Sequence, residues 1–174
     1  MTEAELKARI RDIPDFPKAG ILFRDITPLL ADAAAWRATV DAFVERYRDK
    51  VDIVLGIESR GFIVGSAVAY GLGRGIALVR KPGKLPSQTH AASYELEYGR
   101  DTLEIHRDAL SKGHRVLVID DLLATGGTAS AAVELVQRCG SNVVACAFII
   151  ELAFLGGRKR LEGQEVFSLL RYDR

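Results

Sequence analysis

Residues 116–128 are the stretch of sequence that most constrains the fold. Four consecutive apolar residues, 116–119, lead directly into Asp120 and Asp121, and a turn of small residues follows before a helical pattern begins. The apolar run is rich in β-branched residues and does not alternate with polar ones, which is typical of a strand buried on both faces of a parallel sheet. The order of strand, carboxylates, glycine-containing turn and helix therefore predicts a βα unit of an α/β fold.

The turn of this βα unit has the features of a phosphate-binding site. It ends at a helix N-terminus, where free N–H groups and the helix dipole favour an anion, and its two glycines let the backbone curl around a phosphate. The two aspartates lie at the carboxyl end of the strand and can accept hydrogen bonds from a vicinal diol. A phosphate and a diol at this spacing indicate a 5-phosphorylated ribose. The residues expected to hold the phosphate are Ala124, Thr125, Gly126, Gly127 and Thr128.

Competing motifs fit this turn less well. A plain strand–helix connection would account for the two adjacent glycines, but not for the paired aspartates and the two threonines around them. The sequence has no G-x-x-x-x-G-K-[ST] motif, which argues against a Walker loop, and the glycines at 71, 73 and 75 do not fit the G-x-G-x-x-G pattern of dinucleotide sites.

Strands and helices alternate along the rest of the chain, which predicts one domain, residues 1–174, with a mostly parallel central sheet flanked by helices. Alternating polar and apolar residues on either side of Gly99 also predict a β-hairpin at 93–107. The expected helices are 2–11, 33–48, one opening at 58–61 and ending at 72, and 127–139; the expected strands are 51–57, 76–79, 116–119, 143–150 and 166–170.

The composition argues against several classes of function. The 24 basic and 23 acidic residues give a formal net charge of +1, which provides no general attraction to nucleic acid or to a membrane surface. The charged N-terminus does not fit the pattern of a signal peptide, and the longest apolar run, 143–150, is too short for a membrane span. Two cysteines in such a chain suggest free thiols in a reducing compartment, so we expect a cytoplasmic protein. The three histidines do not cluster with the cysteines, and we expect no metal bound directly by the protein.

A second anion site is predicted at the same edge of the sheet. The segment 59–61 repeats the strand–turn–helix arrangement, although helix capping by Ser59 is an equally simple interpretation. Three cations, Arg80, Lys81 and Lys84, follow the next expected strand. A basic loop is usually only a solvated surface, but three cations at the carboxyl edge of a sheet supply the several donors that a pyrophosphate needs.

The segment VLVIDDLLATGGTA resembles the phosphoribosyl-pyrophosphate (PRPP) motif of the type I phosphoribosyltransferases. Further stretches resemble the adenine phosphoribosyltransferase family in particular, so the resemblance covers nearly the whole chain. It implies the type I phosphoribosyltransferase fold, with a small N-terminal hood (residues 1–30) and a mobile loop (residues 87–107) that folds over bound substrate. The stretches that carry the resemblance to this family are 14–30, 58–62, 80–86, 92–99, 150–163 and 166–173.

The resemblance also implies roles for individual residues. Phe23 matches the aromatic residue that stacks on adenine, and the backbone of Arg24 matches the group that reads the purine edge and would reject a 6-oxo purine. Glu97 matches the catalytic glutamate of the mobile loop, and Tyr98 would help to close the site. Without the resemblance, Phe23 would be assigned to the core and Glu97 to a solvated strand face. The residues implied for pyrophosphate are Ser59, Arg60, Arg80, Lys81 and Lys84, with a cis peptide bond expected between Ser59 and Arg60.

The implied reaction converts adenine and PRPP to AMP and pyrophosphate, a step of purine salvage. Mg²⁺ is the implied cofactor, held mainly through PRPP, pyrophosphate and water, and the family is usually a homodimer. Two alternatives remain open: a transferase for hypoxanthine, guanine, xanthine or a pyrimidine, and a non-catalytic regulator that senses PRPP or a nucleotide. A regulator would be expected to lack the loop acid or the pyrophosphate cations, whereas this chain retains Glu97, Lys81 and Lys84.

Overall fold

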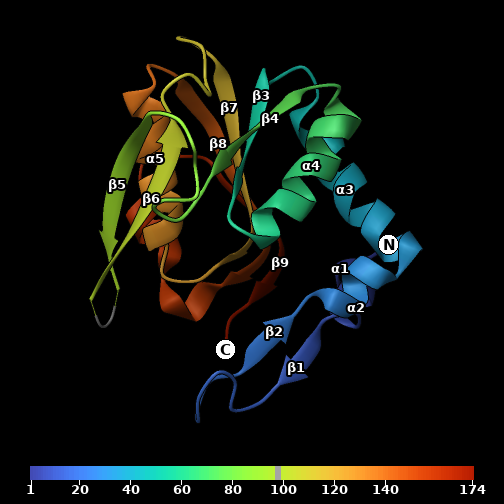
Figure 1. Ribbon diagram of the computed structural model, residues 1–174. Coiled ribbons are helices and arrows are strands. Elements are labelled where there is room, and N and C mark those ends of the chain that lie inside the picture. The colour runs from blue at the N-terminus through green and yellow to red at the C-terminus, as the bar shows by residue number, and fades with distance from the viewer. Residues whose placement is uncertain (97–98) are drawn as a thin grey trace.

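A five-stranded sheet forms the centre of the computed structural model, which describes residues 1–96 and 99–174 (Figure 1). All neighbouring strands of this sheet are parallel, as the alternation of strands and helices predicts. In spatial order the strands are β4 (Gly75–Val79), β3 (Ile53–Ile57), β7 (Arg115–Leu123), β8 (Asn142–Leu152) and β9 (Val166–Tyr172).

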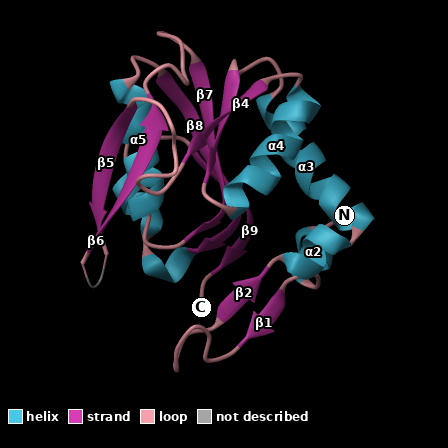
Figure 2. Ribbon diagram, in the orientation of Figure 1, coloured by secondary structure: helices cyan, strands magenta, loops and turns pink. Residues whose placement is uncertain are grey.

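Helices cover both faces of the sheet (Figure 2). Helices α3 (Ala33–Tyr47) and α4 (Arg60–Leu72) lie on one face. Helix α5 (Gly127–Arg138) lies on the other, beneath a hairpin of β5 (Thr89–Glu95) and β6 (Arg100–His106). The fold therefore has the layered α/β architecture that the sequence predicts.

Strand β7 explains why the apolar run at 116–119 does not alternate with polar residues. Val116 and Val118 belong to the apolar cluster under α5, and Leu117 and Ile119 belong to the cluster under α3 and α4. All four residues are fully buried. Successive side chains of a strand point to opposite faces, so a central strand covered on both sides must be apolar at every position.

The N-terminal segment differs from its prediction. Helix α1 (Glu3–Lys7) ends well before residue 11, and Arg11–Ile13 forms strand β1, which pairs antiparallel with β2 (Phe23–Asp25). The pairing of β1 with β2, reinforced by an ion pair between Arg11 and Asp25, takes the place of the last helical turn. The remaining elements are the short helix α2 (Thr27–Ala31) and the 3-10 turns η1 (Ala153–Leu155) and η2 (Gly157–Leu161).

The other expected elements are present with small shifts of their ends. The hairpin strand β5 begins four residues earlier than predicted, at Thr89, because it pairs with β6 as far as His106. The two cysteines, Cys139 and Cys146, are free. Within residues 1–96 and 99–174 none of the helices has the length and hydropathy that a membrane span requires.

Candidate active site

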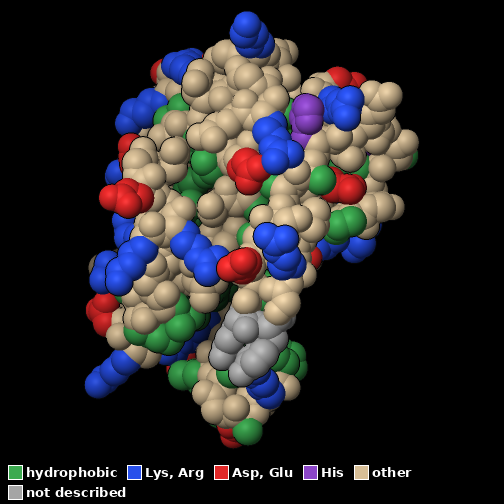
Figure 3. All heavy atoms as spheres, turned by 90° about the vertical axis from the view of Figure 1, so that its left-hand side faces the viewer, with side chains coloured by type: hydrophobic (Ala, Val, Ile, Leu, Met, Phe, Trp, Pro, Cys, Tyr) green, Lys and Arg blue, Asp and Glu red, His purple; other side chains and the backbone are tan. Residues whose placement is uncertain are grey.

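A cavity of about 430 Å³ opens at the carboxyl ends of the central strands. Its wall is formed by the end of β7 with the turn that follows, by the start of α4, and by two residues from outside the sheet, Lys81 and Tyr94. Basic and acidic side chains are interspersed on the face that the hairpin presents (Figure 3). The lining residues predicted to bind ligand are Ser59, Arg60, Lys81, Asp120, Asp121, Ala124, Thr125, Gly126, Gly127 and Thr128.

The turn 124–128 forms a cradle of main-chain groups. Gly126 has φ of 83° and precedes the first residue of α5. Within the described part of the chain, no side chain caps the first turn of this helix. A Cβ atom added at Gly126 would lie 2.4 Å from the carbonyl oxygen of Gly157, so glycine is required for both its backbone angle and its packing. The residues of this helix start line the cavity, where their free N–H groups can bind an anion.

Asp120 and Asp121 lie within β7, where Asp121 is buried and Asp120 is half-buried, and both line the cavity. Burial and the neighbouring Asp121 carboxylate raise the pKa of Asp120 well above its ordinary value. Asp121 forms an ion pair with Arg60, the first residue of α4. Helix α4 can approach this closely because its second residue is Gly61, where a Cβ atom would lie 2.9 Å from Oδ1 of Asp120. The site therefore holds one buried carboxylate that is paired with Arg60 and one, Asp120, whose pKa is raised.

The turn between β3 and α4 contains a cis peptide bond, but not the predicted one. The bond joins Glu58 to Ser59, whereas the expectation was the next bond, between Ser59 and Arg60. The backbone N–H of Glu58 still donates to Val79 as a continuation of the sheet, at 3.0 Å, and Ser59 is already the N-cap of α4, so the chain changes from strand to helix between these two residues. Ser59 makes no capping hydrogen bond in this turn, and it lines the cavity.

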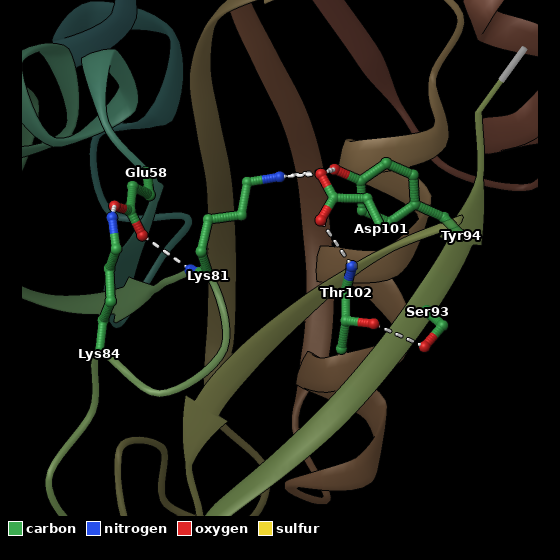
Figure 4. Close-up of polar contacts among 7 residues, drawn as sticks. All are labelled: Glu58, Lys81, Lys84, Ser93, Tyr94, Asp101 and Thr102. Atoms are coloured by element: carbon green, nitrogen blue, oxygen red, sulfur yellow. Dashed lines mark hydrogen bonds and ion pairs between the residues drawn. The ribbon is translucent and has the colours of Figure 1, made fainter. Parts of the chain in front are cut away.

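The predicted basic loop is organised around the carboxylate of Glu58 (Figure 4). That carboxylate accepts hydrogen bonds from Nζ of Lys84 at 2.6 Å, from the backbone N–H of Lys81 at 2.7 Å and from Arg80 at 3.3 Å. Burial alone would raise the pKa of Glu58, but these hydrogen bonds outweigh it and lower the pKa to about 2. Lys81 sends its side chain to the cavity instead, where its Nζ contacts Asp101 and the hydroxyl of Tyr94.

The predicted adenine residues lie on β2, beside the lining residue Arg60, but do not themselves line the cavity. Phe23 is half-buried and packs edge-on against Phe16, with the ring centroids 5.1 Å apart. The guanidinium group of Arg60 lies 5.9 Å from the centre of the Phe23 ring. The side chain of Arg24 pairs with Asp12 and covers the ring of Tyr172 at 4.1 Å. The predicted loop residues Glu97 and Tyr98 lie outside the described residues.

Sequence reasoning missed three residues at this site: Glu58, Tyr94 and Asp101. Tyr94 and Asp101 face each other across the hairpin, and the hydroxyl of Tyr94 donates to Asp101 at 3.0 Å. The ring of Tyr94 packs against Gly127, where an added Cβ atom would lie 2.8 Å from the ring. The sequence holds no clear signal for this pair, because Tyr94 lies five residues before Gly99 and Asp101 only two after it, and a hairpin centred on Gly99 would pair other residues.

The comparison with known proteins agrees with this geometry. Residues 26–167 match the phosphoribosyl transferase domain family. The adenine phosphoribosyltransferase of Geotalea uraniireducens is 61% identical over 169 residues, which are 97% of this chain and 99% of that protein.

Crystal structures are similarly close. That of the adenine phosphoribosyltransferase from Thermoanaerobacter pseudethanolicus superposes with a TM-score of 0.95 at 49% identity, covering 98% of this chain and 100% of that one. The Saccharomyces cerevisiae enzyme, solved with adenine and an imino-altritol bisphosphate, gives 0.93 at 42% identity and covers 97% and 98% of the two chains. The predicted type I phosphoribosyltransferase fold is thus confirmed. The chain belongs to the phosphoribosyltransferase family and, within it, to the adenine phosphoribosyltransferases of purine salvage.

Proposed function

We propose that the cavity at the carboxyl edge of the sheet is where PRPP and adenine react to give AMP and pyrophosphate. The observation that carries this proposal is the convergence of two features on one cavity. The uncapped start of α5 offers main-chain donors to a phosphate, and the adjacent carboxylates of Asp120 and Asp121 offer acceptors to a diol. A 5-phosphorylated ribose carries both groups, so the donors and acceptors match this substrate.

The transfer itself requires positioning and charge stabilisation more than covalent chemistry. Breaking the bond from C1′ to pyrophosphate leaves positive charge on the ribose, which Asp120 and Asp121 stabilise while they hold its hydroxyls. The turn 124–128 holds the 5′-phosphate. Pyrophosphate binds at the other side of the cavity, to Ser59, Arg60 and Lys81. The two remaining cations, Arg80 and Lys84, are paired with Glu58 and add positive potential.

Adenine binds beside Phe23 and the main chain of Arg24 in this proposal. The guanidinium group of Arg24 is already engaged by Asp12 and Tyr172, which supports base recognition by the backbone of that residue and not by its side chain. Residues 1–30 then form the hood over the base, and residues 87–107 form the mobile loop. Glu97 supplies the catalytic carboxylate and Tyr98 helps to close the site.

The donor set of the cavity fits a magnesium ion held mainly by the substrate. Asp120 and Asp121 are oxygen ligands of the kind that Mg²⁺ accepts, and across residues 1–96 and 99–174 no three His, Cys, Asp or Glu side chains converge as a metal site. When bound, Mg²⁺ neutralises charge on the phosphate oxygens. The two aspartates would meet it through the ribose hydroxyls and water.

The exposed face of α4 and β4 supports the expected homodimer. Ile63 and Tyr70 on α4 and Leu78 on β4 are large apolar side chains with high exposure, and Tyr70 is 90% exposed. β4 is also an edge strand of the sheet. Exposed apolar side chains and an edge strand are both features of protein–protein interfaces. We place the dimer interface here, in a cytoplasmic enzyme whose two cysteines stay reduced.

The experiment that tests the proposal is a base panel. AMP formation is measured from adenine, PRPP and Mg²⁺, beside parallel reactions with hypoxanthine and guanine and a repeat in EDTA. Product from adenine alone, lost on chelation, is the expected result. Product from a 6-oxo purine would remove the roles given to Phe23 and Arg24. Tight binding of PRPP without any reaction would favour a regulator that senses PRPP.

A further inference from the structure

Every cation at the pyrophosphate side of the cavity contacts a carboxylate of the protein itself. These carboxylates occupy the cations in the same way that the oxygens of a substrate anion would. A pyrophosphate group that binds these cations therefore competes with the carboxylates for their positive charge. The pairs are Arg60 with Asp121, Lys81 with Asp101, and both Arg80 and Lys84 with Glu58.

The pair of Lys81 and Asp101 is the one best suited to exchange. Asp101 keeps two hydrogen bonds when Lys81 leaves, because its Oδ1 accepts from the backbone N–H of Thr102 at 2.8 Å and its Oδ2 from the hydroxyl of Tyr94 at 3.0 Å. The side chains of Lys81 and Asp101 are 37% and 30% exposed, so water can solvate both during the exchange.

Glu58 is in the opposite situation. Its side chain is only 9% exposed and is fixed by a backbone N–H as well as by two cations. Removing its partners would leave a buried charge without compensation, which is strongly unfavourable. Glu58 therefore holds the basic loop in place, while Asp101 holds only the mobile end of one side chain.

The Lys81–Asp101 pair also connects the hairpin to the rest of the site (Figure 4). Asp101 lies on β6, directly opposite Tyr94 of β5, and the ring of Tyr94 packs against Gly127 at the start of α5. Lys81 follows β4 on the other side of the cavity. This ion pair thus joins the hairpin to the basic loop, beside the backbone bridge between Arg80 and Glu104.

We propose that Asp101 is a positioning residue that competes with pyrophosphate for Lys81, an inference that rests on the proposed function. While PRPP or pyrophosphate is bound, the ammonium group of Lys81 turns from Asp101 to the phosphate oxygens. As pyrophosphate leaves, Asp101 takes the ammonium group back, which favours release. Removing the charge of Asp101 frees Lys81 and also removes a repulsion, so both effects strengthen pyrophosphate binding.

The test is calorimetric titration of pyrophosphate, in the presence of Mg²⁺, into the full-length protein and its Asp101→Asn variant. We expect the variant to bind pyrophosphate about three- to fivefold more tightly, the range that a partly exposed ion pair supports. Its product-inhibition constant for pyrophosphate should fall by the same factor. Asp108→Asn is the control, since it removes the same charge from an exposed turn where the described part of the structure gives no ion pair. Asp101→Ala is a second variant with the same expected sign.

The sign of the change separates this role from simple ordering of Lys81. Weaker binding by Asp101→Asn, or binding equal to that of Asp108→Asn, would overturn the inference, because a residue that merely orders Lys81 weakens binding when it is lost. In a Lys81→Met background the Asp101→Asn change should strengthen binding less than it does in the wild-type background, because only the removed repulsion remains, and an equal gain in the two backgrounds would also overturn the inference. A wild-type protein that makes no AMP and binds no pyrophosphate would instead contradict the proposed function, and this inference with it.

Discussion

The two anion-binding ends of the cavity are built in opposite ways. The cradle at 124–128 consists of main-chain groups that are held in place by the contact between Gly126 and Gly157, and it is complete before any ligand arrives. The pyrophosphate end consists of charged side chains, each paired with a carboxylate of the protein. One end can therefore fix the position of PRPP, while at the other end the carboxylates compete with pyrophosphate for the cations and so influence how readily it leaves.

The largest effect is expected from damage to the cradle. Gly126→Ala places a methyl group 2.4 Å from the carbonyl oxygen of Gly157, so the turn must move and its N–H groups lose their alignment. We expect kcat/KM for PRPP to fall on the order of 1,000-fold, the scale seen when fixed main-chain donors are lost or misplaced. Steady-state kinetics of AMP formation measures this.

Gly163→Ala is the matched control for this variant. Gly163 has φ of 84°, close to the 83° of Gly126, but no described atom beyond its chain neighbours lies within 4 Å of an added Cβ. Both variants should lose about 1–2 kcal/mol of stability from the backbone angle, and Gly163→Ala should keep its activity. Equal losses of activity in the two variants would mean that the cradle does not depend on its close packing.

A smaller loss of activity, with a gain of stability, is expected from Asp120→Asn. The pKa of Asp120 is raised in the folded protein. The folded state therefore loses stability as pH rises above 3.8, the ordinary pKa of an aspartate, and through the raised pKa. Asparagine cannot ionise and avoids that loss. Urea unfolding should show the variant to be more stable than wild type at pH 7, with the difference vanishing below about pH 4.

The same substitution should lower kcat/KM for PRPP on the order of 100-fold, because one carboxylate no longer stabilises charge on the ribose. A variant that is less stable at pH 7 would contradict the account of Asp120 as a carboxylate with a raised pKa. A variant with unchanged kinetics would remove it from the ribose site.

The smallest effect is expected at the basic loop. Glu58→Gln removes a carboxylate whose pKa is lowered to about 2, so its stabilising contribution is present above pH 4.5 and is lost as pH falls toward 2. We expect the free energy of unfolding at pH 7 to fall by about 1–2 kcal/mol, a value that is discounted because Lys84 is half-exposed. We also expect a rise of about two- to fivefold in KM for PRPP. Unfolding curves and initial rates across this pH range measure both.

Glu162→Gln is the control for Glu58→Gln, since Glu162 is exposed and has no ion pair among residues 1–96 and 99–174. It should unfold like wild type at every pH. If Glu58→Gln also unfolds like wild type at pH 7, the carboxylate does not anchor the loop, and the contrast between Glu58 and Asp101 fails.

The parts of the structure that could be predicted are those encoded within one short stretch. The unbroken apolar run at 116–119 predicts a strand buried on both faces. The structure confirms this, because successive residues of the run belong to the two apolar clusters in turn. The cradle is contained in five consecutive residues, so its main-chain donors follow from the glycines and the helix start. The parallel sheet follows from the repeated alternation of strands and helices.

The parts that could not be predicted depend on contacts between distant segments. Lys84 pairs with Glu58 across 26 positions and Lys81 with Asp101 across 20, and a pattern of charges along the chain does not specify such partners. The end of α1 at Lys7 likewise follows from the pairing of β1 with β2, which competes with the helical pattern of residues 2–11. The cis bond precedes Ser59, the N-cap of α4, and no short-range pattern in the sequence distinguishes this bond from the next.

A crystal structure of the protein with AMP bound would distinguish the two ends of the cavity. We predict the phosphate group on the N–H groups of residues 124–128, the ribose hydroxyls on Asp120 and Asp121, and the adenine ring on Phe23. We also predict that the cradle keeps its conformation when AMP binds, with Gly126 against Gly157. A phosphate group bound instead by Lys81 and Lys84, with the start of α5 empty, would contradict the assignment of the two ends of the cavity.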